Sequence, residues 1–493
     1  MRKAIAATAA VAALSVGSVL GMAYWLGGVA TERLTRETQE LVALSPNFKL
    51  VEQQTRRGLF SSTHAVTLQL GCLPSSPADK QGDAKGAARP IHISWRDVVH
   101  HGPFPGGSGV GAAAIDSELL TPRIWQKQLD QLFGKQALVR VHSQIGLRGD
   151  LVSEFTLAGL QWSDPAQGGV VTKPLIGRVM GNVRAEPNAA GSYVLDIPRI
   201  DVNMHGPDGA ALSIAVGRVL VELELAKRAD PKLWLRPLKA AGFVSSVVFT
   251  GSATGAMGAP TTHARASWDG IKLGTEATLE HGSWSGSYGF TTKGKVNDFA
   301  VDKLELAASL KHLEAASFQR ALGAAFSTTL SCDRPASAQE LEGLLPALQK
   351  ELVALLVHNP EYALDKLGLD LGDKHAELSY SLGTRGITPA NQTTPVPLLL
   401  ATKGFARANV AVHLALVELL ANKLVNYDSK PTQQTPMAAT SAIVGSFVEK
   451  LVRQGYLQRT RDQLQASVAF EAGQLTLNGK PVDAPALVSP FGP

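Results

Sequence analysis

The sequence predicts an α+β protein, mainly antiparallel β, with large curved sheets and packing helices behind one N-terminal transmembrane helix. Three observations support this fold class. An uncharged run from Ala4 to Thr31 follows the basic residues Arg2 and Lys3. Much of the remaining chain alternates apolar and polar residues in segments of strand length, separated by glycine and Asp-Gly turns. A few other segments repeat apolar residues at helical spacing.

The N-terminal run has the length of a membrane anchor. A helix that spans a bilayer needs about 20 residues, whereas the hydrophobic part of a secretory signal has roughly 7 to 15. Since Arg2 and Lys3 precede the run and the next basic residue is Arg33, the positive-inside rule keeps the N-terminus in the cytoplasm. We therefore expect residues 1–30 to anchor a single-pass protein in a bacterial inner membrane, with the bulk of the chain in the periplasm. A signal cleaved at Gly28-Val29-Ala30 is the alternative.

Small residues recur every four positions within this run. Ala13, Gly17 and Gly21 would lie on one face of the helix, where a second helix can approach closely. This spacing predicts a homodimer, and chance recurrence in an alanine-rich segment is the alternative.

The first half of the exported part, residues 31–241, is expected to be rich in strands. Residues 31–44 should continue the anchor as a helical stalk, because the residue before Pro46 is pushed out of helical geometry. Helices are expected at 123–133 and at 231–241, where Pro237 interrupts the second. The expected strands are 48–56, 59–70, 91–99, 110–120, 137–147, 151–162, 170–185, 193–204 and 212–225.

The second half, residues 242–493, is expected to mix strands and helices. Ser337 and Glu340 form a capping box before a helix that ends at Asn359-Pro360. Another helix should begin at Thr435-Pro436 and end at Gly455. The expected strands lie within 243–313 and at 363–382 and 398–416, and a last hairpin spans 464–477.

The segment Ala211–Leu225 is apolar on both faces when it is read as one strand. A sheet covered on both sides explains most such strands. The alternative is that one face lines a groove for lipid.

Composition excludes some partners and cofactors. The net charge of +5 is small for 493 residues and the basic residues are scattered, so no nucleic acid partner is expected. Cys72 and Cys332 lack a second cysteine or histidine at metal-ligand spacing. We expect two unpaired cysteines, with a bridge between them as the alternative in an oxidising compartment.

No sequence motif indicates catalysis. Gly289 to Lys295 has the spacing of a phosphate loop, but Val296 replaces the magnesium-binding hydroxyl. Gly282 to Gly286 resembles a nucleophile elbow with Trp284 in place of the nucleophile. His100 and His101 would point to opposite faces of a strand, which disfavours a shared metal ion. We therefore expect no enzyme, no metal and no cofactor.

Three motifs beyond the anchor occur in a characteristic order: Arg57-Gly-Leu-Phe-Ser-Ser62, His101-Gly-Pro-Phe-Pro105 and the hairpin Gly473–Lys480. In these motifs the chain resembles the YdgA-like family of bacterial inner-membrane-anchored periplasmic proteins of unknown function. Leu344-Leu-Pro-Ala-Leu348 also resembles the family's C-terminal helix. The family motifs supply the candidate interaction residues, which are Arg57, Gly58, Phe60, Ser61, Ser62, His101, Gly102, Pro103, Phe104, Asn478 and Gly479.

Within these motifs we expect scaffold roles. Gly58 and Gly102 should form turns, and Phe60 and Phe104 should pack into the core. Binding of a partner by Arg57 and His101 is the alternative. The resemblance implies location and self-association rather than a reaction.

Three functions are compatible with the sequence. The first is a non-catalytic envelope scaffold or interaction protein. The second is a protein that binds or transfers lipid, as in the AsmA-like proteins, an analogy of fold only. The third is a hydrolase, which would need a polar cleft with a nucleophile and a base in reach.

Overall fold

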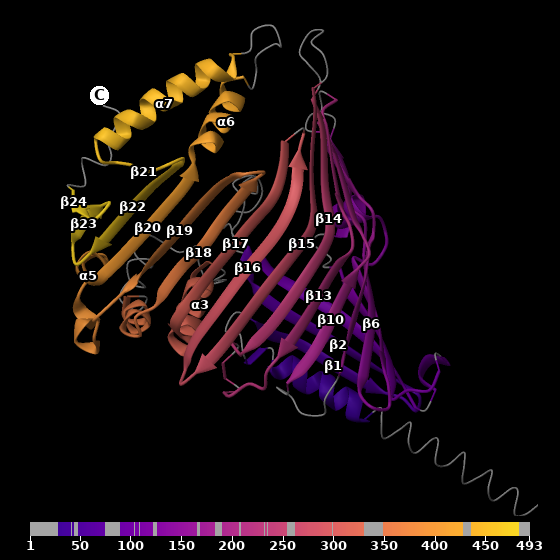
Figure 1. Cartoon of the computed structure of the whole chain (residues 1–493). Coiled ribbons are helices and arrows are strands. Elements are labelled where there is room, and N and C mark those ends of the chain that lie inside the picture. Colours follow the sequence, from indigo (N-terminus) through magenta and orange to yellow (C-terminus); the bar gives the residue numbers. More distant parts are fainter. Residues whose placement is uncertain are drawn as a thin grey trace, which may run out of the picture. The chain divides into compact units, whose positions relative to one another are not determined.

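The computed structural model describes most of the chain after the N-terminal segment (Figure 1). The residues outside the description are 1–27, 41, 44–47, 74–88, 103, 108, 122–125, 165–167, 183–189, 207–208, 231, 234, 254–261, 298, 330–348, 427–434 and 483–493. The chain forms two compact units. Unit 1 comprises residues 1–264 and 319–345, and unit 2 comprises residues 265–318 and 346–493. The residue boundary expected at 241 lies inside a strand of unit 1.

Unit 1 is an antiparallel meander in which β1 to β6 pair in chain order and the sheet continues from β6 through β9, β10 and β13 to β14. Four of its long strands are interrupted, so that pairs of short strands such as β12 and β13 continue one another along β14. The strands are β1 Lys49–Arg57, β2 Ser61–Leu73, β3 Arg89–His101, β4 Ala113–Leu120, β5 Val139–Ile145, β6 Asp150–Leu157, β7 Gln161–Asp164, β8 Gly168–Thr172, β9 Leu175–Asn182, β10 Gly191–Ile197, β11 Ile200–His205, β12 Ala211–Val216, β13 Val219–Leu225 and β14 Leu238–Ala253. This arrangement confirms the prediction of antiparallel sheet.

The interruption at residues 217–218 explains why the segment Ala211–Leu225 has apolar residues on both faces when it is read as one strand. In β13 the apolar residues Val219, Val221, Leu223 and Leu225 stand at odd positions, with Leu220 as the exception, whereas in β12 the large ones stand at even positions. The mainly apolar side therefore changes between the two strands. The expectation had treated both as one strand.

Near the ends of β4, β5 and β6, the two faces of the unit 1 sheet differ in chemistry. One face carries cross-strand ion pairs, including Arg96 with Glu118 at 2.9 Å. On the same face, Arg218 lies 2.8 Å from Asp196, and its hydrogen bond lowers the pKa of that carboxyl. The opposite face is apolar, and Val66 and Val99 are buried there. The apolar face is the one that a helix can cover.

Residues 28–40 form that helix. Thr31 and Thr38 are buried, and the hydroxyl of Thr38 donates to the carbonyl of Leu34. A Cβ atom on Gly28 would come within 2.7 Å of Arg57 Nη2 at the end of β1. The helical continuation expected at 31–44 is therefore present, and it packs on its own unit rather than forming a stalk.

Unit 2 is a second antiparallel meander, and Figure 1 shows β17 to β20 side by side in chain order. Its strands are β15 Thr262–Glu280, β16 Ser283–Val296, β17 Phe299–Glu314, β18 Glu361–Leu371, β19 Lys374–Thr384, β20 Gly404–His413, β21 Gln458–Thr460, β22 Gln463–Glu471, β23 Gln474–Leu477 and β24 Lys480–Pro481. The strand β20 pairs with β22, so the helices between them leave the order of the sheet intact.

The helices of unit 2 pack on one face of its sheet. The helix α6 (Leu414–Val425) buries Leu416 against Val301 and Leu371. Residues 349–357 are helical and pack with α5 (Val396–Lys403) through Val353 and Leu399. Unit 2 also contains α7 (Met437–Arg453), which packs on α6, and the 3₁₀ turn η4 (Pro389–Thr393). Unit 1 contains α2 (Gln126–Phe133) and the 3₁₀ turn η2 (Pro105–Gly107), and α3 (Ala315–Thr329) crosses the residue boundary between the two units.

Several expected elements differ from the structure. The described residues between 232 and 241 are not helical, and residues 238–241 already belong to β14. The expected strand 363–382 is a hairpin of β18 and β19, and the start of 398–416 is helical in α5. The helix α6 was not expected at all. In each case pairing within the sheet or packing on it outweighs local preference.

Among the residues from 28 onward that the structure describes, no helix is long and apolar enough to span a membrane. The expected anchor, including Ala13, Gly17 and Gly21, lies outside those residues.

The prediction that Cys72 is unpaired is wrong. Cys72 is buried at the end of β2 and is disulfide-bonded. Cys332, the only other cysteine of the sequence, lies outside the described residues. The fold brings together distant segments, which spacing along the sequence does not reveal.

Candidate functional site

A cavity of about 470 Å³ lies between helix 28–40 and the apolar face of the unit 1 sheet. Its size falls within the usual range of roughly 300–1,000 Å³ for small-molecule sites. The lining is mainly apolar and includes Leu34, Ala113, Ile115, Ile145, Leu151 and Tyr193. A hydrocarbon group fits this chemistry better than a polar substrate does.

Register explains how distant segments meet in the cavity. Ala113 lies opposite Ile145, and Ile145 lies opposite Leu151. Leu151 in turn lies opposite Gly181, which pairs with Tyr193. In an antiparallel sheet, residues that are directly opposite share a face. In this row the small side chain of Ala113 leaves room above the sheet, whereas the ring of Tyr193 covers Gly181, where a Cβ would lie 2.6 Å from Tyr193 Cδ1.

The few polar groups in the cavity are already satisfied. Arg33 Nε lies 2.8 Å from Glu37 Oε1 on the same helix. The hydroxyl oxygens of Ser143 and Ser153 are 2.7 Å apart on β5 and β6. These groups can fix an orientation, but they offer no nucleophile and base pair.

Two arginines flank the cavity near Tyr193. Arg228 and Arg236 lie in the loop between β13 and β14, and Arg228 Nε is buried with no hydrogen-bond partner among the described residues. Burial lowers the pKa of Arg236, and the neighbouring charge of Arg228 lowers it further. Two adjacent guanidinium groups of this kind favour an anion.

A buried polar cluster lies on the same sheet face, in β2 and β3. His64 Nδ1 lies 3.0 Å from Asp97 Oδ2, and His64 Nε2 lies 3.0 Å from Gln53 Nε2. Sequence reasoning missed this cluster, although His64 stands at the same alternate positions of β2 as the buried Val66 and Leu68.

Ser62 and His101 form a second buried pair. Ser62 Oγ lies 3.1 Å from His101 Nε2, and both residues are 2% exposed. A serine and a histidine at this distance resemble part of a hydrolase site. Here a substrate has no access to the hydroxyl, so the pair serves the packing of β2 on β3.

The turn residues of the first motif adopt the expected geometry. The amide of Gly58 donates to the carbonyl of Ser61, 2.9 Å away, and a Cβ at position 58 would lie 2.6 Å from that oxygen. Gly102 has a φ of 115°, which glycine adopts readily. Arg57 and Ser61 are exposed on the surface of this turn.

The prediction that Phe60 and Phe104 pack into the core is wrong. Phe60 is 51% exposed and Phe104 is 65% exposed. Phe60 precedes β2 at a strand end, where no layer covers it. Phe104 follows Gly102 in the loop after β3, and Pro103 lies outside the described residues.

Asn478 and Gly479 close the C-terminal hairpin. Both have positive φ, 50° and 77°, which suits a tight two-residue turn. Asn478 Oδ1 accepts from the amide of Ser467 at 2.9 Å, and Asn478 Nδ2 donates to the carbonyl of Gly455 at 2.8 Å. This side chain fixes the hairpin to the end of α7.

Unit 2 has an apolar cavity of its own, of about 390 Å³. Its floor is a row of paired residues, Leu310, Tyr362, Leu382 and Ala406, with Phe470 on the next strand. Leu356 and Leu400 from the helices of the same unit form its wall. Both units thus hold an apolar cavity between a sheet face and a helix.

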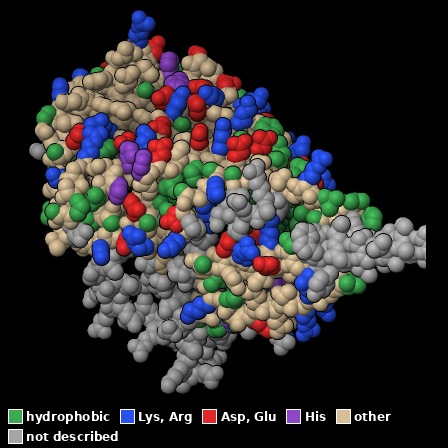
Figure 2. Space-filling view, turned by 90° about the horizontal axis from the view of Figure 1, so that it is seen from below, with side chains coloured by type: hydrophobic (Ala, Val, Ile, Leu, Met, Phe, Trp, Pro, Cys, Tyr) green, Lys and Arg blue, Asp and Glu red, His purple; other side chains and the backbone are tan. Residues whose placement is uncertain are grey.

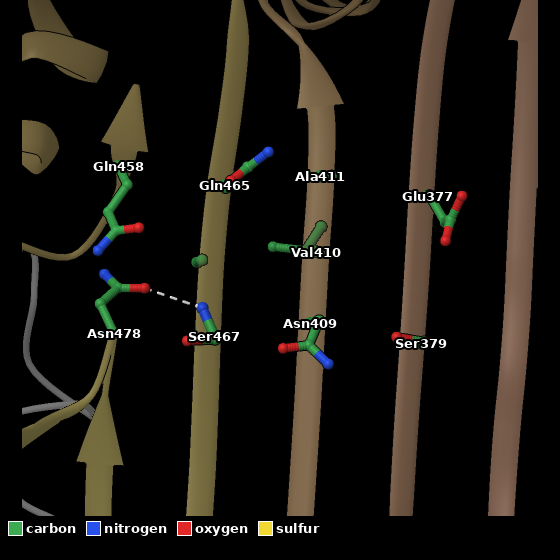
Figure 3. Close-up of a pocket in the computed structure, with 10 residues that line it drawn as sticks. Glu377, Ser379, Asn409, Val410, Ala411, Gln458, Gln465, Ser467 and Asn478 are labelled. Atoms are coloured by element: carbon green, nitrogen blue, oxygen red, sulfur yellow. Dashed lines mark hydrogen bonds between the residues drawn. The ribbon is translucent and has the colours of Figure 1, made fainter. Parts of the chain in front are cut away.

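The opposite face of the unit 2 sheet carries a small polar pocket of about 200 Å³ (Figure 3). Glu377, Ser379, Asn409 and Gln465 stand there on three neighbouring strands, and the hydrogen bond from Ser467 to Asn478 borders it. Among the lining residues Glu377 is the one carboxylate; its Oε2 lies 3.4 Å from Nε2 of His375, which does not itself line the pocket. No group of three or more potential metal ligands occurs among the described residues.

On the face that Figure 2 shows, hydrophobic side chains lie in small groups between basic and acidic ones.

These features define a class, a large antiparallel β protein with apolar cavities beneath helices on its sheets. The chain belongs to the family described as "Bacterial protein of unknown function (DUF945)", whose model matches residues 1–485. The resemblance to a bacterial family of unknown function is confirmed in that form, and the YdgA-like name stays a resemblance. No curated protein and no solved structure matches the chain.

Proposed function

We propose that this chain is a membrane-anchored protein of the bacterial cell envelope that binds the hydrocarbon part of a lipid. The cavity beneath helix 28–40 carries the proposal, because its apolar lining suits an acyl chain. The cavity of unit 2 has an apolar lining too and would be a second binding site for hydrocarbon. The proposed activity is binding or transfer, with no catalytic step.

Two features support the proposed location. The run from Ala4 to Thr31 is uncharged and follows Arg2 and Lys3, as in an inner-membrane anchor with a cytoplasmic N-terminus. Cys72 is disulfide-bonded, and disulfides persist in the periplasm rather than in the cytosol. The bulk of the chain would thus face lipid from the periplasmic side.

Lipid analysis of the purified full chain tests the function. The chain is washed extensively in detergent, extracted with organic solvent and analysed by mass spectrometry. We expect about one hydrocarbon-chain lipid per chain or more. The control is residues 1–30 fused to an unrelated soluble protein, which retains only lipid bound to the anchor. Equal amounts of lipid in both preparations would contradict the proposal.

A scaffold that assembles as a homodimer is the second candidate, and the helices α6 and α7 favour it. Leu424 is 78% exposed and Ile443 is 67% exposed. Such apolar residues on neighbouring helices are typical of protein interfaces. Light scattering of the full chain should give a dimer mass that Leu424→Glu with Ile443→Glu reduces to that of a monomer. A monomer mass for the unchanged chain would exclude this candidate.

A further inference from the structure

Several loops of unit 1 gather at one edge of its sheet. The amide of His101 at the end of β3 donates to the carbonyl of Phe60 before β2, 2.9 Å away. The amide of Ala112 before β4 donates to the carbonyl of Ile145 at the end of β5, 2.8 Å away. The turn 57–61, the loop 102–112 and the turn 146–149 therefore lie along the same edge.

The loop 226–237 lies at this edge too. Asn182 at the end of β9 pairs with Asp150 at the start of β6. Along the same edge, Gly191 at the start of β10 pairs with Leu225, and Leu225 pairs with Leu238. The loop between β13 and β14 thus follows the edge defined by the other turns, which we call the loop edge.

The loop edge exposes large apolar side chains that the core does not need. Phe60, Phe104, Val110 and Leu147 are all at least half exposed, and Leu59 is nearly so. They come from three separate turns. Separate turns that each present an apolar tip are unusual for a surface that faces only water.

Basic residues dominate the charge of the same loops. The four segments carry Arg57, Arg148, Lys227, Arg228, Lys232 and Arg236 against the single acidic residue Asp230. Apolar tips surrounded by basic side chains are typical of regions that rest on an anionic membrane surface.

Residues 1–27, which precede the described helix, connect to unit 1 at this same edge. The helix 28–40 starts at Gly28, beside Arg57. The 27 preceding residues contain the uncharged run that we propose as the anchor. Since the anchor joins the unit at the loop edge, an anchored chain holds this edge next to the bilayer.

We propose that the loop edge of unit 1 docks on an anionic bilayer, with Phe60, Phe104 and Leu147 inserted between lipids and Arg228 and Arg236 at lipid phosphates. The proposal rests on the membrane anchor of the proposed function. Val29, Ala112 and Leu147 also line the cavity beneath helix 28–40. Docking would therefore bring the rim of that cavity to the lipid from which its ligand comes.

Fluorescence of the full chain in nanodiscs tests the docking. Phe104→Cys is labelled with an environment-sensitive dye, and lipid carrying a nitroxide near its head group serves as the quencher. The matched control is Val171→Cys, a residue that is 43% exposed in β8. Val171 lies eleven residues before Asn182, the residue at which β9 ends at the loop edge. At ~3.3 Å per residue, this separation along the chain is about 36 Å.

We expect at least threefold stronger quenching by the nitroxide lipid at position 104 than at position 171, and the reverse order with iodide in the water. Replacing anionic lipid by phosphatidylcholine, or Arg228→Gln with Arg236→Gln, should reduce the quenching at position 104 at least twofold. A chain that stays in the nanodisc while position 104 is quenched like position 171 would overturn the docking and leave the anchor intact. A chain that does not stay in the nanodisc would overturn the anchor itself.

Discussion

Filling the cavity of unit 1 should abolish ligand binding while the fold remains. Ala113 is the best site, because it is 4% exposed, lines the cavity and makes no side-chain hydrogen bond that would be lost. Ala113→Phe directs a phenyl ring into the space between the sheet and helix 28–40. The substitution therefore competes directly with a bound hydrocarbon chain.

The expected change in Kd follows from the volume of the cavity. A methylene group is similar in size to a water molecule, which takes ~30 Å³ of liquid, so a cavity of about 470 Å³ has room for roughly fifteen groups. A phenyl ring would displace about four of them, at about 0.8 kcal/mol each. The loss of about 3 kcal/mol corresponds to a Kd raised more than about 100-fold.

The assay is a titration with a fluorescent fatty acid on the full chain in nanodiscs, with the signal of empty nanodiscs subtracted. The matched control is Thr156→Phe, which adds the same ring on the exposed polar face of β6. Hydrogen exchange of both variants should match the unchanged chain, which shows that the sheet is intact. Equal affinity of Ala113→Phe and Thr156→Phe would refute the assignment of the cavity as the binding site.

Three further predictions concern the fold. Asp97→Ala leaves the buried imidazole of His64 without this hydrogen-bond partner and should lower the opening free energy of β2 and β3, measured by hydrogen exchange, by about 1–3 kcal/mol; the exposed Asp116→Ala should cost less than about 1 kcal/mol, and equal effects would contradict the reasoning. Asn478→Ala should lower the opening free energy of the C-terminal hairpin by about 3 kcal/mol through lost hydrogen bonds, and Asn478→Gly, which keeps the turn geometry, should cost less. The hydrogen bond with Tyr288 raises the pKa of Tyr362, so this stabilisation holds below the ordinary tyrosine pKa and is lost as pH rises through the folded value; Tyr288→Phe should lower the pKa of Tyr362 in an ultraviolet titration, and an unchanged curve would contradict it.

The sequence predicted the antiparallel meander well because alternation of apolar residues reports directly on a sheet with one apolar face. Prediction from the sequence failed where the pairing of strands, rather than local preference, determined the structure. Pro237 within 231–241 indicated a broken helix, yet β14 begins right after it and pairs with β12 and β13. The segment Leu414–Val425 was read partly as strand, although its apolar residues are packed as a helix on Val301.

The candidate site was only partly accessible to sequence reasoning. The lipid alternative was raised from Ala211–Leu225, whereas the cavity is lined by residues such as Ala113, Ile145 and Tyr193. These residues are far apart in the chain, and only the register of the strands between them brings them together. Phe60 was wrongly expected in the core, because a sequence motif shows the type of a residue but not its exposure to solvent.

Photo-crosslinking with a fatty acid that carries a diazirine on its chain tests the central claim most directly. The label is activated on cells that express the full chain, and the modified peptides are mapped by mass spectrometry. The account predicts adducts on helix 28–40 and on the cavity residues of β4, β5 and β6, and their loss in Ala113→Phe. Adducts confined to α6 and α7, or none on residues 28–493, would contradict it.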